Sequence, residues 1–67
     1  MSDTKYPDIK VRLTGIDGNA FSIIGAVSAG LRQHEVPSDE IDKFREEAMS
    51  GDYDNVLQTC MKWVDVE

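Results

Sequence analysis

The stretch IKVRLT, residues 9–14, alternates strictly between apolar and polar side chains. Because successive side chains of a strand point to opposite faces, this pattern predicts a β-strand with one covered face. Residues 1–8 are polar and include Pro7, so we expect a flexible segment ahead of the strand. An unpaired strand is unstable, so it must pair either with the C-terminal run WVDV or with its own copy in a homodimer.

Apolar residues return at helical spacing over residues 19–34, through Ala20, Ile24, Val27 and Leu31. The pattern runs without a turn signal for longer than the roughly five or six residues of a typical strand, so it predicts a helix. The alternative is a hairpin, because the dipeptide DG at residues 17–18 is common in tight turns.

Small side chains form a stripe along this predicted helix: Ser22, Gly25, Ala26, Ala29 and Gly30. A glycine inside a helix costs about 1 kcal/mol relative to alanine, and a closely approaching neighbour is the usual compensation. That neighbour is either another element of the chain or a second copy across a dimer interface. We favour packing within the chain, because a domain of 67 residues needs its central helix covered.

Two further helices are predicted at residues 39–50 and 53–63. Ser38 and Asp52 are typical N-cap residues for them, and Pro37 ends the segment before the first. The tail WVDVE alternates and predicts a short closing strand. The sequence therefore predicts a small α+β domain over residues 1–67, with an N-terminal strand, three helices and a C-terminal strand that can pair with the first. The predicted core contains Ile9, Val11, Leu13, Phe21, Ile24, Val27, Leu31, Ile41, Phe44, Val56, Leu57, Cys60 and Trp63.

Composition narrows the classes of function. Thirteen Asp and Glu against seven Lys and Arg give a net charge of −6, which argues against nucleic acid as a direct ligand. One cysteine and one histidine cannot fill a tetrahedral zinc site, and we expect no cofactor. A lone cysteine suits a reducing compartment, and no apolar run approaches the roughly 18 residues of a membrane span. We therefore expect a cytoplasmic protein without membrane contact.

No catalytic constellation can be identified. Cys60 and His34 are chemically capable of forming a thiolate–imidazole pair, but Cys60 lies in an apolar helical stripe and no third partner can be named. We expect a protein that is not an enzyme, with no catalytic, cofactor-binding or metal-binding residues.

The turn TGIDGNAFS, residues 14–22, offers a candidate anion or small-molecule site. Backbone N–H groups at a helix N-terminus bind anions, and Gly15, Asp17, Gly18 and Asn19 would shape this one. However, the P-loop and dinucleotide-binding glycine patterns are absent, and Asp17 would repel an anion. We favour a structural turn in which both glycines take positive φ and Asp17 or Asn19 caps the helix.

Acidic residues crowd the second half of the chain, at Asp39, Glu40, Asp42, Glu46, Glu47, Asp52 and Asp54. A solvated helix face explains such a cluster. The alternative is an acidic surface that occupies the basic site of a partner protein.

The segments GIDGNAFSIIGAV, SGDYDNVLQTCM and WVDV together resemble a group of short, uncharacterised proteins from bacterial and phage genomes. These proteins share a GNAF-type turn–helix element and a DYxxxLxxC helix. The resemblance implies that the segments form one unit and favours a mobile-element setting, but it implies no activity. The missing catalytic groups, the small size and the strand that needs a partner predict an interaction or accessory module whose partner is a protein.

Overall fold

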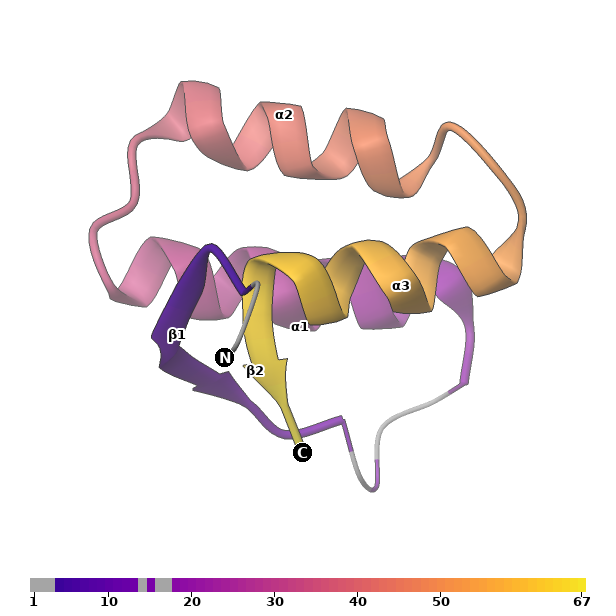
Figure 1. Cartoon of the computed structure of the whole chain (residues 1–67), viewed down its shortest axis with the longest axis horizontal. Coiled ribbons are helices and arrows are strands. Elements are labelled where there is room, and N and C mark those ends of the chain that lie inside the picture. The colour runs from indigo at the N-terminus through magenta and orange to yellow at the C-terminus, as the bar shows by residue number, and fades with distance from the viewer. Residues whose placement is uncertain (1–3, 14, 16–17) are drawn as a thin grey trace.

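The chain starts and ends in a strand, and the helices between them connect the two. The computed structural model describes residues 4–13, 15 and 18–67. Its elements, in order, are β1 (Tyr6–Val11), α1 (Ala20–Gln33), α2 (Ser38–Ala48), α3 (Tyr53–Trp63) and β2 (Val64–Val66) (Figure 1). The predicted α+β class and order of elements are confirmed.

The two strands form a parallel sheet within the chain. Tyr6 pairs with Val64 and Val11 with Val66, with an irregularity in β1 between Tyr6 and Lys10. Parallel strands need a long crossover connection, which the helices supply. Glu67 extends the ladder, since its N–H donates to the Val11 carbonyl at 2.9 Å. The first strand therefore pairs with the C-terminal strand of the same chain, which was one of the two predicted alternatives. This pairing does not require a second copy of the chain.

The first strand lies earlier in the chain than predicted. We expected residues 9–14, but β1 begins at Tyr6 and ends at Val11, and Thr14 lies outside the described residues. The flexible segment expected over residues 1–8 is also too long, because Tyr6–Asp8 belong to β1. Pro7 is tolerated because a two-stranded sheet has only edge strands, where a missing N–H need not break the ladder.

The helices follow their predicted positions closely. The hairpin alternative is wrong, since residues 20–33 form one continuous helix. Asp52 caps α3 by accepting a hydrogen bond from the Asn55 N–H at 3.0 Å. Ser38 is not an N-cap: it is the first residue of α2, and the preceding Pro37 makes no side-chain capping bond.

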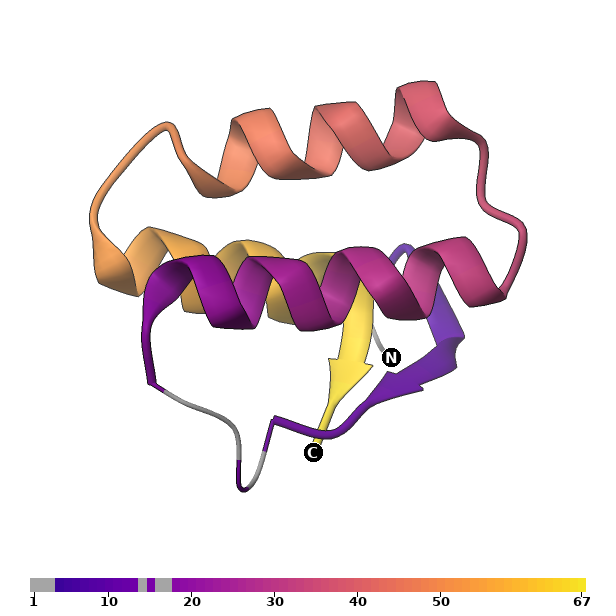
Figure 2. The ribbon, with the colours of Figure 1, turned by 180° about the vertical axis from the view of Figure 1, so that it is seen from behind.

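Figures 1 and 2 show how the layers are arranged. In both views α1 and α3 lie at the same level, with α2 on one side of this pair and the two strands on the other. The core fills the space between these layers, and Val27, Leu31, Phe44, Cys60 and Val64 have no exposed surface.

One predicted core residue is wrong. The side chain of Phe21 is 73% exposed, because it lies in the first turn of α1, beside the point where α2 has ended and no longer covers α1. Leu13 and Leu57 are only partly buried. Conversely, Ile23 is buried and was missed, because α1 packs against β1 as well as against the other helices. Ala48 and Val64 are buried too.

Trp63 anchors the N-terminal segment to the helices. Its indole N–H donates to Glu47 Oε2 at 2.6 Å. Its ring packs edge-on against that of Phe44, with the two ring centres 5.7 Å apart. The Lys5 ammonium lies 4.3 Å from the centre of the same ring and pairs with Glu40 at 3.0 Å. The hydrogen bond and charge of Lys5 lower the pKa of the Glu40 carboxyl, and Glu40 raises the pKa of Lys5. The segment before β1 is thereby tied to both α2 and α3.

Candidate functional site

The turn before α1 is built as a helix start. Asn19 is the N-cap, and its carboxamide oxygen accepts from the Phe21 N–H at 2.8 Å. Gly15 has a φ of 87°, as predicted, but Gly18 lies outside the positive-φ region, so that half of the prediction is wrong. Asp17, the other candidate cap and anion-site residue, lies outside the described residues.

The same turn is tied to α3. The Tyr53 hydroxyl donates to the Gly18 carbonyl at 2.6 Å, so the first residue of α3 holds the turn as well. The Phe21 N–H, a backbone donor that an anion at this helix start would need, is thus already bonded to Asn19, and the Gly18 carbonyl is bonded to Tyr53. These contacts favour the structural interpretation of the turn over an anion or small-molecule site.

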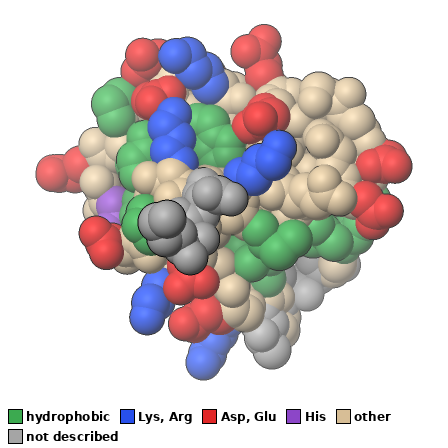
Figure 3. Space-filling model, in the orientation of Figure 1, with side chains coloured by type: hydrophobic (Ala, Val, Ile, Leu, Met, Phe, Trp, Pro, Cys, Tyr) green, Lys and Arg blue, Asp and Glu red, His purple; other side chains and the backbone are tan. Residues whose placement is uncertain are grey.

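The predicted acidic surface is divided by the fold. Glu40 pairs with Lys5, Glu47 accepts the Trp63 indole N–H, and Asp52 caps α3. The remaining acidic residues are exposed: Asp39, Asp42, Glu46 and Asp54. On the face seen in Figure 3, acidic side chains are scattered around the outline and do not form one patch.

The cysteine and the histidine lie in different environments. Cys60 has no exposed surface, and burial raises the pKa of its thiol to about 11, so it is protonated at neutral pH. His34 is exposed at the C-terminal end of α1. Among the described residues, no three His, Cys, Asp or Glu side chains gather in a way that could hold a metal ion. No helix in this part of the chain is both long and apolar enough to cross a membrane.

A groove runs along the surface where α1 faces the C-terminal half of α2 and the start of α3. It consists of two adjoining hollows, of about 280 and 310 Å³, which share Phe21, Ile24 and Met49. We call it the α1–α2 groove.

The end of the groove nearest α3 is apolar. Its hollow is lined mainly by Ala20, Phe21, Ile24, Met49, Tyr53 and Val56. Three large side chains around it are strongly exposed: Phe21 at 73%, Met49 at 47% and Tyr53 at 45%. Phe21 belongs to α1, Met49 is the C-cap of α2, and Tyr53 begins α3, so only the tertiary fold brings them together.

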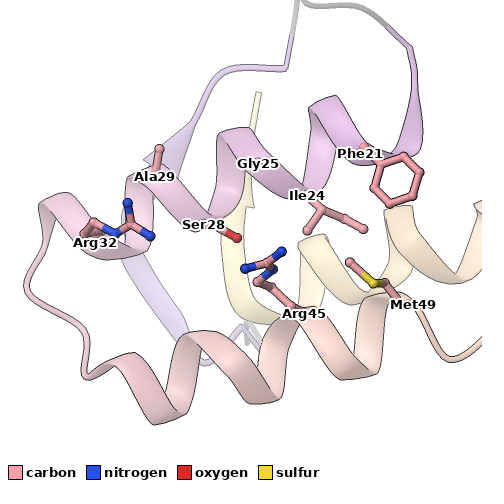
Figure 4. A pocket seen from close by; sticks show the side chains of 8 residues that line it. All are labelled: Phe21, Ile24, Gly25, Ser28, Ala29, Arg32, Arg45 and Met49. Carbon is pink, nitrogen blue, oxygen red and sulfur yellow. The ribbon is translucent and has the colours of Figure 1, made fainter.

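The other end of the groove is polar and cationic. Arg32 of α1 and Arg45 of α2 line its hollow, and neither forms an ion pair with a described residue. Ser28 lies between them with only 8% of its surface exposed, and its hydroxyl has no hydrogen-bond partner among the described residues. Figure 4 shows this hydroxyl pointing across the groove toward Arg45, with Phe21 and Met49 at the opposite end from Arg32.

One sequence signal, the stripe of small residues, points to this groove. Gly25 and Ala29, two members of the predicted small-residue stripe, line its polar hollow. A Cβ atom at Gly25 would meet no described residue within 4 Å, so close packing against the part of the chain that the structure describes does not explain this glycine. A search of known protein families, curated proteins and solved structures found no match to this chain.

Proposed function

We propose that this protein is a non-enzymatic interaction module that binds a partner protein through the α1–α2 groove. The observation that carries the proposal is the gathering of Phe21, Met49 and Tyr53, all strongly exposed, around one apolar hollow. Aromatic residues and methionine are enriched in the buried centres of protein interfaces, and contiguous exposed apolar patches mark interaction sites.

The groove is a better candidate than the acidic surface. Three of the seven acidic residues already serve internal contacts, whereas the exposed side chains of the groove have apolar surface that folding leaves in water. The resemblance to short bacterial and phage proteins supports an accessory role in a mobile element. The lone cysteine supports a cytoplasmic setting.

Selection from a random-peptide display library tests this proposal without a known partner. We expect the wild-type protein to enrich peptides that lose binding to Phe21→Ser and to Met49→Ser. Met61→Ser is the matched control, because Met61 is 50% exposed but does not line the groove. Since these side chains are exposed, each variant should keep the wild-type circular dichroism spectrum. Peptides whose binding is equally weakened by Met61→Ser, or not weakened by Phe21→Ser, would contradict the proposal.

A further inference from the structure

We infer that the α1–α2 groove recognises a peptide segment that carries an apolar side chain close to a carboxylate. The apolar side chain would occupy the hollow beside Phe21, Met49 and Tyr53, and the carboxylate would lie between Arg32 and Arg45. This inference rests on the proposed function and adds the chemical class of the partner.

The two arginines are unusual for this chain. The protein has only seven Lys and Arg against thirteen Asp and Glu, yet two of the seven line one hollow without an ion-pair partner among the described residues. A guanidinium presents its N–H donors in a planar fork that matches a carboxylate. Asp42 and Glu46 line a neighbouring hollow together with Arg45, and the net charge of the protein is −6. These neighbouring carboxylates and the negative net charge repel a polyanion such as a nucleic acid much more strongly than they repel a single carboxylate.

Ser28 points independently to a polar ligand. Its hydroxyl is buried and unpartnered, a state that is rare in folded proteins because the lost hydrogen bonds to water are not replaced. The hydroxyl lies in the same hollow as both arginines. The hydroxyl oxygen has less than 1 Å² of exposed surface, so a carboxylate held by the guanidinium groups would accept from Ser28 once a covering side chain moves aside.

The shape of the groove favours a peptide over a small ion. The cationic and apolar hollows adjoin along α1, so a ligand must extend to reach both. Gly25 leaves open space along the cationic hollow, which lets a peptide backbone approach the helix closely. Two chemically different anchors on one extended ligand are what a short peptide segment provides.

Matched peptides and matched variants test the inference by isothermal titration calorimetry. The probe is the peptide most enriched in the display selection, together with its analogue in which Asp or Glu is replaced by Asn or Gln. We expect the enriched peptides to combine an acidic and an apolar residue, and the amide analogue to bind about tenfold or more weakly. Arg32→Gln/Arg45→Gln should cause a similar loss for the acidic peptide and almost none for its analogue.

The control variant is Arg12→Gln/Lys62→Gln, which removes the same charge at exposed positions outside the groove. It should change the affinity by less than about twofold, since exposed charges at a distance are largely screened by salt. Ser28→Ala should weaken the acidic peptide severalfold while leaving the amide analogue unchanged.

The failure of the inference is distinguishable from failure of the proposed function. Peptides that need Phe21 but carry no acidic residue, and that bind the arginine double variant as well as the wild type, would overturn the inference and leave the proposed function standing. Basic peptides that bind regardless of Phe21 and of both arginines would overturn the two together.

Discussion

Gly30 of α1 and Val11 of β1 are in such close contact that a Cβ atom at residue 30 would lie 2.8 Å from Val11 Cγ2. The helix backbone therefore lies directly against the strand. This is the close approach that the stripe of small residues predicted within the chain. Gly25, five residues earlier on the same helix, has no such neighbour.

The two glycines of α1 should respond oppositely to alanine. Gly25→Ala should raise the free energy of unfolding by about 0.5–1 kcal/mol, because it removes a helix-interior glycine at no steric cost. Gly30→Ala gains the same helix propensity, but the new methyl group must displace Val11, and such overpacking costs about 1–3 kcal/mol. We therefore expect the free energy of unfolding to fall by about 1 kcal/mol. Urea denaturation measures both. An equal gain from the two substitutions would contradict the close contact between α1 and β1.

The turn before α1 offers a second matched pair of glycines. Gly15→Ala should lower the free energy of unfolding by about 1–2 kcal/mol, because its φ of 87° penalises a Cβ atom. Gly18→Ala should cost much less, since its φ is not positive and its Cβ would make an ordinary 3.7 Å contact with the Tyr53 hydroxyl. Thermal melts of both variants test this, and a larger loss at Gly18 would refute the assigned backbone geometry.

The Lys5–Glu40 pair predicts a pH dependence. Because Lys5 lowers the pKa of Glu40 below its ordinary value of 4.5, the folded state binds fewer protons than the unfolded state in this range. The contribution of the pair to stability is therefore present above pH 4.5 and disappears as the pH falls through the lowered pKa. Carboxyl NMR should show a Glu40 midpoint below 4.5 that rises in Lys5→Gln. An unchanged midpoint in this variant would mean that the ion pair does not form in solution.

Ser28 predicts a conflict between stability and binding. Ser28→Ala should raise the free energy of unfolding by about 1 kcal/mol, because it removes a buried hydroxyl without a partner and improves helix propensity. Ser22→Ala, an exposed position of the same helix, reports the propensity gain alone and should stabilise less. Such a gain at Ser28, with weaker peptide binding, is typical of a residue retained for function. A loss of stability in Ser28→Ala would instead show that the hydroxyl serves the fold.

Local periodicity was sufficient to predict most of the fold. The long helical pattern correctly favoured a helix over a hairpin. The alternation at both ends correctly predicted two strands, but it left open whether the first pairs with the last or with a second copy. Phe21 could not be assigned from spacing, because its exposure depends on where α2 ends. The flexible segment predicted from Pro7 also depended on the tertiary structure. A proline is tolerated in β1 because β1 is an edge strand.

The candidate site was much less predictable than the fold. Arg32 and Arg45 lie on different helices, and each follows an ordinary pattern, a cation in the last turn of its helix. Their meeting in one hollow depends on how α1 and α2 pack, which no local pattern encodes. Gly25 was the available signal, but the stripe was interpreted as a surface that packs against another element or a second copy. Of its two glycines, only Gly30 has a close neighbour among the described residues.

The most direct test of the α1–α2 groove as the binding surface is a ¹⁵N amide NMR titration of the wild-type protein with the most enriched acidic peptide. We predict saturable shifts that are largest at Phe21, Gly25, Ser28 and Met49. Shifts concentrated instead at Gly15 to Asn19, or along the exposed acidic residues of α2, would show that the groove is not the binding surface.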